Sequence, residues 1–552
     1  MEEKRKLSKK AFDLQVHIGY PLVYDMCFVW RGCPDWAERS TCIMYSKVLS
    51  GLVQGVEGTL ISVETDIHDG LPVMNMVGYL SSCVREAGER VRTALRNSDF
   101  SLPPKRVTIN LFPADIRKEG TAFDLPIAVG ILASMGIIPI DTINSILIIG
   151  ELGLDGHVNS VNGVLAIVHH AYTCGVRSCI VPAGNSGEAA IIEGMTVIPV
   201  ESLRELVDHL CGIHIIEPEY VDVDAVLSSY MEEEGDFSEV KGHETLKRGI
   251  EIAAAGMHNI LMTGPAGAGK SMIARRIPSI LPRLTLDESI EITKIYSVAG
   301  MLDEGHPVIN RRPFRSPHHT ISLHALSGGG RDPRPGEISL AHGGVLFLDE
   351  LPEFSRNVLE VMRQPLEEGV VHISRLNGTY RFPADFMLVA ARNPCPCGQY
   401  PDMNRCTCTV NQIRNYNARI SKPLLDSIDI NVEVRKVQYR ELFEPQRGAS
   451  SAEMRARVLA AQRLQQERYA GENIRFNSQM DSGMCSRYIR LGAAEKNFME
   501  ESFDRYRMTA RGSNRVLKIA RTIADLDGDE NVQVRHLREA VFFRNSDGEG
   551  GI

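Results

Sequence analysis

Short apolar runs alternate with helix-forming segments along most of the chain, which is the pattern of a protein built from alternating strands and helices. Residues 107–115, "VTINLFPAD", predict a strand, and 145–158, "SILIIGELGLDGHV", predict two strands joined by a glycine-rich turn. The run 125–140 is uncharged but too short, and too interrupted by Gly and Pro, to cross a membrane. It predicts a buried helix leading into a strand. The fold class expected is α/β with several domains.

Changes in this pattern divide the chain into five parts. Residues 1–43 hold both tryptophans and three cysteines without a clear period, and Met44 reads like a natural start, so the first part is an extension that need not belong to the folded protein. Residues 44–211 form an α/β domain. Residues 212–239 form a linker, in which 217–239 carries nine acids and no Lys or Arg. Residues 240–432 alternate strands and helices again, and 433–552 form a mainly helical lid with a C-terminal tail.

Composition limits the function classes. A chain of 552 residues is too long for one core, and a net charge of −9 excludes a globally basic nucleic-acid binder. Residues 435–521 nevertheless contain 18 Lys and Arg against 10 Asp and Glu, which is either a solvated helical surface or a local surface for a polyanion. We find no signal peptide and no membrane span, so a cytoplasmic protein with reduced thiols is expected.

The segment "NILMTGPAGAGKSMIARRI" predicts a buried strand, a glycine loop and a helix, and it contains the pattern G-x-x-x-x-G-K-S. Glycines let backbone N–H groups surround phosphate oxygens, and the helix directs its positive end toward them. Lys270 supplies a cation to the β- and γ-phosphates, and Ser271 offers a hydroxyl to Mg²⁺. The predicted nucleotide-binding residues are Gly264, Pro265, Ala266, Gly267, Ala268, Gly269, Lys270 and Ser271.

Two later strands end in polar residues that complete this chemistry. "GGVLFLDELPEF" ends in Asp349, which suits Mg²⁺ binding, and Glu350, which suits polarising an attacking water. "FMLVAARN" ends in Asn393, which can orient that water against the γ-phosphate. The order of glycine loop, acidic strand, asparagine strand and helical lid indicates an ATP-hydrolysing machine of the AAA+ class, with ATP and Mg²⁺ as ligands.

The segments "RPFRSPHHTIS", "LSGGGRDPRPGEISLAHGGVLFLDELPEF" and "ARNPCPCG" resemble the magnesium-chelatase-like AAA+ family of the ComM/YifB type, from Met44 to about residue 545. The resemblance implies a homo-hexameric ring with nucleotide between subunits. It also implies DNA remodelling, as branch migration or helicase-like activity in natural transformation or recombination. "MTARGSNRVLKIARTIADL" is similar to the lid helix of the family, which implies that Arg511 senses the γ-phosphate, with Arg515 as second choice.

Two basic segments are candidates for contact with DNA. "VVHISRLNGTYRFP", 370–383, alternates about Asn377–Gly378 and predicts a hairpin, with Arg375 and Arg381 as phosphate contacts in a ring pore. "NRRPFRSPHHT", 310–320, is a second basic insertion that could line the same pore. The alternatives are an ordinary structural hairpin and a solvated loop.

The domain 44–211 resembles the Lon protease domain, which has a ribosomal S5-like fold. Comparing "RKEGTAFDLPIA" and "VNSVNGVLAIVHHA" with it puts Ala122 at the nucleophile position and Leu165 at the lysine position. Neither side chain can attack or take up a proton, and no base is apparent for the adjacent Thr121. We therefore expect a scaffold, or a module that binds a partner or DNA, without peptidase activity.

One segment departs from the family. In "ISKPLLDSIDI", 420–430, Ser427 stands where the family has Arg, and Lys422 replaces the usual Gly. If that arginine is the finger that reaches a neighbour's γ-phosphate, either another arginine substitutes, with Arg419 and Arg435 nearest in sequence, or the ATPase is slow.

Four cysteines follow Asn393 closely, as C-x-C, eight residues and C-x-C. They are Cys395, Cys397, Cys406 and Cys408. Two such pairs can complete a tetrahedral zinc site, while the alternatives are a reduced loop without metal and a redox or disulfide centre. The role expected is a structural clasp near the predicted γ-phosphate sensor.

Three functions remain in competition. The first is an ATP-driven ring that remodels DNA. The second is a motor subunit of a magnesium chelatase, against which we count the N-terminal domain, because chelatase motor subunits are expected to lack it. The third is a scaffold whose assembly nucleotide controls, with weak ATPase, which Ser427 keeps open.

Overall fold

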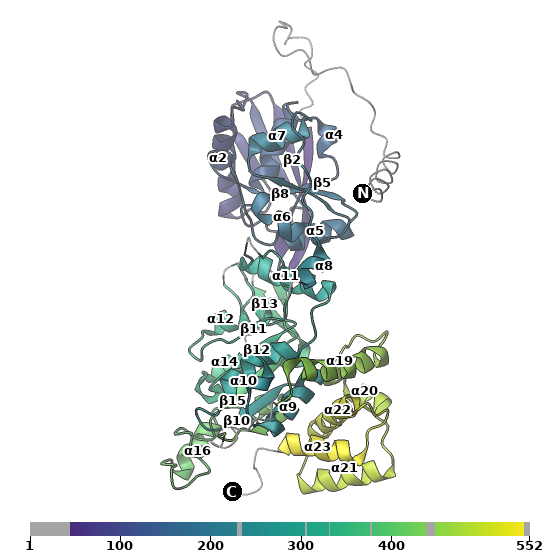
Figure 1. Cartoon of the computed structure of the whole chain (residues 1–552). Coiled ribbons are helices and arrows are strands. Elements are labelled where there is room, and N and C mark those ends of the chain that lie inside the picture. Colours follow the sequence, from purple (N-terminus) through teal and green to yellow (C-terminus); the bar gives the residue numbers. More distant parts are fainter. Residues whose placement is uncertain are drawn as a thin grey trace, which may run out of the picture.

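The computed structural model describes residues 45–228, 235–303, 306–330, 332–375, 378–437 and 448–545. The predicted extension 1–43 lies outside the described residues. Figure 1 shows an N-terminal domain above a central core, with a group of C-terminal helices beside that core. The expected α/β architecture with a helical C-terminal region is confirmed.

The N-terminal domain is a seven-stranded mixed sheet in the order β3-β4-β2-β1-β5-β8-β9. One apolar cluster packs α2, α3 and α7 against one face, and a second cluster packs α5 against the other. The elements are β1 (Tyr45–Gln54), β2 (Glu57–His68), β3 (Met74–Val77), α2 (Ser82–Asn97), β4 (Arg106–Phe112), α3 (Asp124–Ser134), α4 (Ile140–Ile143), β5 (Ile146–Ile148), β6 (Glu151–Leu152), β7 (Val158–Asn159), α5 (Val164–Thr173), β8 (Ser178–Pro182), α6 (Ser186–Ala189), β9 (Thr196–Val200) and α7 (Leu203–Leu210).

The apolar run 125–140 forms a fully buried helix, as expected, but it does not lead directly into a strand. Helix α3 ends at Ser134, Gly136 adopts a φ of +73°, and Pro139 precedes the short helix α4 before β5 begins. Gly and Pro interrupt both periodic structures, so a turn separates the helix from the strand. The likeness of this domain to Lon stays a prediction.

The core is a five-stranded, fully parallel sheet in the order β11-β12-β15-β10-β16. We call the edge where these strands begin the amino edge and the edge where they end the carboxyl edge. Its elements are α8 (Val223–Ser228), α9 (Glu244–Gly256), β10 (Ile260–Thr263), α10 (Lys270–Arg276), η3 (Ile277–Ile280), α11 (Leu286–Ala299), β11 (Phe314–Arg315), α12 (Leu323–Ser327), α13 (Glu337–Leu340), β12 (Val345–Leu348), η4 (Leu351–Glu353), α14 (Arg356–Val361), α15 (Arg363–Glu368), β13 (Val370–Arg375), β14 (Gly378–Pro383), β15 (Met387–Arg392), α16 (Val410–Asn417), α17 (Lys422–Asp426) and β16 (Ile430–Glu433).

The lid is helical and shares one apolar cluster with β10, β16 and α9. Figure 1 shows α16 and the lid helices on opposite sides of the core. The lid elements are α19 (Ser451–Arg468), η5 (Asn477–Gln479), α20 (Ser482–Tyr488), α21 (Ala493–Arg505), α22 (Ala510–Asp527) and α23 (Val534–Asn545). Among the helices described, none combines the length and hydrophobicity needed to cross a membrane.

The core contacts the N-terminal domain mainly through α11, which packs against α5. Ser297 on α11 donates a hydrogen bond to Glu188 of the N-terminal domain, and Lys294 lies 2.9 Å from the Nδ1 atom of His169. Burial raises the pKa of Glu188, although Ser297, Asn185 and the Leu165 N–H donate to its carboxylate. The two domains therefore meet through a closed polar contact.

Candidate active site

The loop 264–271, the P-loop, connects the carboxyl end of β10 to α10. A Cβ at Gly264 would lie 2.3 Å from the carbonyl oxygen of Val434, so only glycine fits where this loop passes β16. Gly267 and Gly269 have φ values of +76° and +84°, which favour glycine. The backbone of the loop is therefore shaped by its glycines, as a phosphate cradle requires.

Lys270 connects the P-loop to the neighbouring strand. Its Nζ donates to the carbonyl oxygens of Gly264 at 2.6 Å and Pro265 at 3.0 Å, and to Oδ1 of Asn393 at 3.1 Å. The side chain is buried, and burial lowers the pKa of Lys270, while the nearby charges of Asp349 and Glu350 act in the opposite direction. The structure thus brings two predicted site residues, 123 positions apart, into direct contact.

Ser271 and Asp349 are a second pair in direct contact. The Ser271 hydroxyl donates to Oδ2 of Asp349 at 2.5 Å, and Oδ1 of Asp349 accepts from the Glu350 N–H at 2.9 Å. A hydroxyl and a carboxylate together are oxygen ligands of the type that Mg²⁺ prefers. The donor set at this point therefore fits Mg²⁺ beside a phosphate cradle.

Glu350 stands at the open side of the site. Its φ of +52° turns the chain directly after β12, and its side chain is 53% exposed. Oε2 of Glu350 lies 3.7 Å from Nδ1 of His319, whose ring is 4.1 Å from that of His318. The contact with His319 was missed from the sequence. The signal that could have found it is topological, because β11 and β12 are neighbours and the residues that follow each share the carboxyl edge.

Arg511 and Arg515, the two candidates for the γ-phosphate sensor, do not reach the P-loop of their own chain. Arg515 lies 3.5 Å from Asp429, which directly precedes β16 at the amino edge. Arg511 is 81% exposed and lies 3.8 Å from Glu367 of α15. The five residue-to-residue steps from Asn259, opposite Asp429, to Gly264 span about 16 Å of strand. Sequence similarity could not reveal this separation, because it depends on how the lid docks.

The positions considered for an arginine finger divide between the two edges. Ser427 is buried at the amino edge, where its carbonyl accepts from Asn259 Nδ2 at 3.1 Å and its hydroxyl donates to the Leu424 carbonyl. Arg419 pairs with Glu353 at 2.8 Å, three residues beyond Glu350, and Arg435 follows Val434 beside Gly264. Both possible substitutes therefore lie at the carboxyl edge, and Lys422 is exposed at the start of α17.

The predicted hairpin is present, although its turn residues 376 and 377, and so the predicted Asn377, lie outside the described part of the chain. Strands β13 and β14 pair antiparallel with Arg375 opposite Gly378. Arg375 and Arg381 are exposed, and Arg375 Nε donates to the Gly330 carbonyl at 3.2 Å. A Cβ on Gly55 of the N-terminal domain would lie 2.9 Å from the Arg381 carbonyl, so the hairpin packs under that domain.

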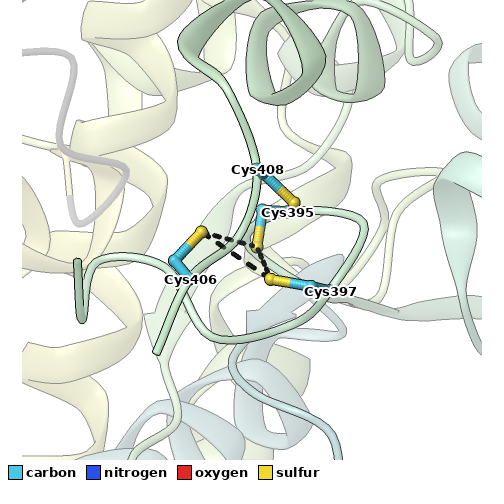
Figure 2. A group of neighbouring side chains, drawn as sticks. All are labelled: Cys395, Cys397, Cys406 and Cys408. Carbon is cyan, nitrogen blue, oxygen red and sulfur yellow. Dashed lines mark hydrogen bonds between the residues drawn. The ribbon is translucent and has the colours of Figure 1, made fainter. Parts of the chain in front are cut away.

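The four cysteines after β15 converge. Figure 2 shows Cys395, Cys397, Cys406 and Cys408 around one point, and their sulfur atoms all lie within 4.8 Å of one another. The Sγ separations are 3.4 Å for 395–397, 3.8 Å for 395–406 and 3.7 Å for 397–406. Four sulfurs at 2.3 Å from a tetrahedral Zn²⁺ would stand about 3.8 Å apart. The cluster therefore has the size of a zinc site.

Backbone donors favour the thiolate of Cys397, whereas at Cys406 and Cys408 the backbone donors are outweighed by burial and the neighbouring thiols, which raise the pKa of both. N–H groups of Gln399 and Thr407 lower the pKa of Cys397 to about 6. The Tyr400 N–H donates to Cys395 Sγ at 3.4 Å. A Cβ on Gly398, which has a φ of +73°, would lie 3.4 Å from the backbone nitrogen of Ala266 in the P-loop. The cysteine loop consequently lies against the phosphate cradle, as well as following Asn393 in sequence.

The positions compared with a protease lie in the N-terminal domain. Leu165 is fully buried, and Ala122 packs against the same apolar cluster. The Thr121 hydroxyl donates to the carboxylate of Glu151, a partner that the sequence did not reveal. Next to it, the buried Asp124 pairs with Arg90 at 2.8 Å. The polar groups here bind one another, and the two positions compared with catalytic residues are apolar.

The chain matches known protein families and relatives along most of its length. Residues 236–442 match the family described as "Magnesium chelatase, subunit ChlI", and residues 448–544 match its C-terminal region. The chain is 39% identical to the competence protein ComM of Haemophilus influenzae over 92% of its own length and 97% of that relative. The chain belongs to the magnesium-chelatase-like family of ComM and YifB. It is also 40% identical to YifB of Escherichia coli, over 89% of this chain and 96% of YifB.

Within this family, the resemblance to chelatase subunits is weaker. The 38 kDa magnesium-chelatase subunit of Cereibacter sphaeroides is 22% identical over 55% of this chain. Residues 63–185 of the N-terminal domain, however, match a family described as "Subunit ChlI of Mg-chelatase". The presence of an N-terminal domain therefore does not by itself separate ComM/YifB proteins from chelatase subunits, and it does not count against a chelatase role as the sequence analysis expected.

Proposed function

We propose that the chain hydrolyses ATP at the carboxyl edge of its core sheet. The observation that carries the proposal is the pair of contacts Lys270–Asn393 and Ser271–Asp349, which join residues following three different strands at one point. Lys270 would bind the β- and γ-phosphates, Glu350 would accept a proton from the attacking water, and Asn393 would orient that water. These side chains lie beside loops whose backbone needs glycine, as phosphate binding demands.

Ser271 and Asp349 would hold Mg²⁺, which neutralises charge on the phosphates when it is bound. The Ser271 hydroxyl donates to Asp349 at 2.5 Å, so the two ligands lie together and need no rearrangement of the backbone. Glu350 is not part of this pair, and its half-exposed carboxylate lies 3.7 Å from His319. The positions of the two acids therefore suit Asp349 to bind the metal and Glu350 to accept a proton.

We further propose a ring in which the amino edge of one subunit faces the carboxyl edge of the next. Arg511, Arg515 and the position of Ser427 share the amino edge, so none of them would meet its own P-loop. A head-to-tail contact repeated around a closed ring brings such residues to a neighbour's site. A hexamer is the ring that the family resemblance implies. Arg511 would then act on the nucleotide of the adjacent subunit.

DNA is the partner that we propose for this motor. The exposed Arg375 and Arg381 stand on a hairpin beside the junction with the N-terminal domain. His319, in the segment that follows β11, lies 3.7 Å from Glu350, and further along the same segment the Gly330 carbonyl accepts a hydrogen bond from Arg375. This segment would therefore connect DNA held by the hairpin to the proposed catalytic base. The relative from Haemophilus influenzae is named a competence protein, which supports a role with DNA.

The test combines ATPase and branch-migration assays on a synthetic four-way junction. We expect ATP-dependent strand exchange, ATPase stimulated by single-stranded or branched DNA, and loss of both activities in Lys270→Ala and on chelation of Mg²⁺. Replacing Arg375 and Arg381 by Ala should weaken DNA stimulation and reduce its salt dependence while basal ATPase stays. Dependence of ATPase on a porphyrin-binding partner would instead favour the chelatase role, which the family descriptions support. Binding without turnover would favour the scaffold.

We propose, finally, that the cysteine cluster binds one Zn²⁺ in a structural role. Four thiolates leave no open position for a substrate, so the metal would be closed and non-catalytic. Its position against Ala266 and after Asn393 would make it a brace for the phosphate site.

A further inference from the structure

A cavity of about 430 Å³ lies where the linker helix, the core and the lid meet. Leu227 of α8 forms one part of its wall, residues 275–283 a second, residues 309–315 a third and Arg455 of α19 a fourth. None of the P-loop residues lines it, although Arg275 stands on the helix that begins at Lys270. Six arginines line the cavity: Arg275, Arg283, Arg311, Arg312, Arg315 and Arg455.

Two of these arginines, Arg312 and Arg315, already donate to carboxylates and carbonyls within the protein. Arg312 is buried and donates to the carbonyls of Pro282 and Gly343, both at 2.7 Å, and to Glu288 at 2.9 Å. Arg315 donates two hydrogen bonds to Glu337, at 2.6 and 2.7 Å. Their charges are balanced by carboxylates outside the cavity wall. These two side chains therefore shape the cavity rather than offer a binding group.

Arg275 and Arg311 differ from this pair. Both are solvent-exposed, and within the described residues neither has a hydrogen-bond or ion-pair partner. Arg455 donates to the Ser279 carbonyl at 2.7 Å and has further interactions of its own, so it belongs to the wall of the cavity like Arg312 and Arg315. No carboxylate among the described residues lines the cavity. The two exposed guanidinium groups, one from α10 and one from the segment before β11, thus stand at one space whose described wall holds no acidic side chain.

Besides the arginines and the polar Ser279, Tyr296 and Asn310, the wall is apolar. Leu281, Pro282, Ile309, Pro313 and Phe314 contribute to it. A cavity of this size holds a small organic molecule and is far too small for duplex DNA. Guanidinium groups match the geometry of phosphate oxygens and bind them with two donors at once. Arginine beside apolar surface suits a ligand with a phosphate at one end and a less polar group at the other.

We propose that this cavity binds a phosphorylated small molecule of about the size of a mononucleotide, at a site separate from the P-loop. The inference goes beyond the proposed ATPase and does not depend on it. Because the wall includes α8, α10 and α19, a bound phosphate would connect the linker, the core and the lid. Binding should therefore stabilise the arrangement of these three parts and raise the unfolding temperature.

The experiment uses the full chain with Lys270→Ala, which disables phosphate binding at the P-loop. Calorimetric titration and thermal unfolding are measured with pyrophosphate, with ADP and with a 5′-phosphorylated oligonucleotide. We expect saturable binding of pyrophosphate or ADP. Replacing Arg275 and Arg311 by Gln should weaken it about tenfold or more, because two charge-assisted contacts are lost. Arg463→Gln with Arg490→Gln is the matched control, since both are exposed and lie outside the cavity.

Equal binding in the double variant and its control would overturn the proposal, and so would the absence of saturable binding. Binding of the oligonucleotide alone would also overturn it, because the ligand would then be a strand end. Failure of ATP hydrolysis would leave every one of these readouts intact.

Discussion

The two edges of the core sheet carry polar residues of different kinds. At the carboxyl edge, Lys270 donates to backbone carbonyls, Asp349 accepts from the Ser271 hydroxyl and the Glu350 N–H, and Glu350 remains half exposed. At the amino edge, Asp429 is buried and accepts from His258 at 3.3 Å, while Arg515 lies 3.5 Å away. The same strands begin at one edge and end at the other. Ionised side chains that are buried and paired, such as Asp429, stabilise the fold, whereas a half-exposed carboxylate such as Glu350 can contact a ligand.

The amino edge is also where the lid attaches. His258 contacts Asp429 through Nδ1 and Thr522 of α22 through Nε2, at 2.8 Å. Burial alone would raise the pKa of Asp429, but His258, Arg515 and Lys518 lower it on balance. A carboxylate, an imidazole and a hydroxyl thus form one chain of contacts from β16 to the lid. These contacts hold α22, and with it Arg511 and Arg515, at the amino edge.

The largest expected effect comes from the carboxyl edge. Glu350→Gln should lower kcat for ATP by about 10²–10⁴-fold, because the amide cannot take a proton from water. The free energy of unfolding should change by less than about 0.5 kcal/mol, since the side chain is half exposed. Steady-state ATPase and chemical denaturation measure the two quantities. Glu353→Gln at the same edge is the matched control, and an equal loss of kcat in that control would contradict the assignment of Glu350.

The opposite result is expected at the amino edge. Asp429→Ala should lower the free energy of unfolding by about 3–5 kcal/mol, because His258 and Arg515 lose a buried partner. Asp426→Ala, an exposed neighbour, should cost less than about 1 kcal/mol. Denaturant titration with both variants tests the comparison. Equal costs would show that the amino edge is no more tightly coupled than ordinary surface.

The same variant has a predicted pH dependence. A lowered pKa in the folded state means that Asp429 contributes its stabilisation above its unfolded value of 3.8 and loses it as pH falls through the folded value. The difference between the parent chain and Asp429→Ala should therefore be full near pH 7 and shrink in strong acid. A difference that grew on acidification would contradict the sign.

A further prediction concerns the proposed contact between the amino edge of one subunit and the carboxyl edge of the next. Mixing two inactive variants should recover a part of the ATPase activity. Lys270→Ala lacks a P-loop cation and Arg511→Ala lacks the proposed sensor, so each alone should have little ATPase. If Arg511 acts on a neighbour, an equal mixture that assembles at random restores intact sites at about a quarter of the interfaces. Mixed ATPase assays measure this. An unrecovered mixture, with assembly verified by light scattering, would sink the head-to-tail arrangement.

The cysteine cluster should produce the smallest change in activity. Cys397→Ser with Cys406→Ser should remove bound zinc and lower kcat only severalfold, because the metal would brace the loop against Ala266 without touching substrate. Metal analysis and ATPase assays give the two values. Cys174→Ser, an exposed cysteine elsewhere, is the control. A zinc content near zero in the parent chain would exclude the zinc site.

The features that could be predicted from the sequence are those set by residues close to one another in the chain. Gly264, Gly267 and Gly269 form a recognisable loop because each meets a steric or conformational demand within a few residues. Asp349 and Asn393 could be predicted to share one edge because both follow apolar strands, and parallel strands bring such ends together. The hairpin at 370–383 follows from alternation about a turn. In these cases the physical cause lies within a short stretch of chain.

Local sequence accounts for the α/β and helical regions, the family, the glycine loop and the polar strand ends, because backbone geometry and periodic burial act over short distances. The three-dimensional structure was needed to show that His319 meets Glu350, that Gly398 lies against Ala266, and that Arg511 lies at the amino edge. It also shows that arginines from separate segments share one cavity. These features depend on which strands are neighbours and on how the lid docks. Such long-range choices arise from packing of the whole core and leave no pattern in local spacing.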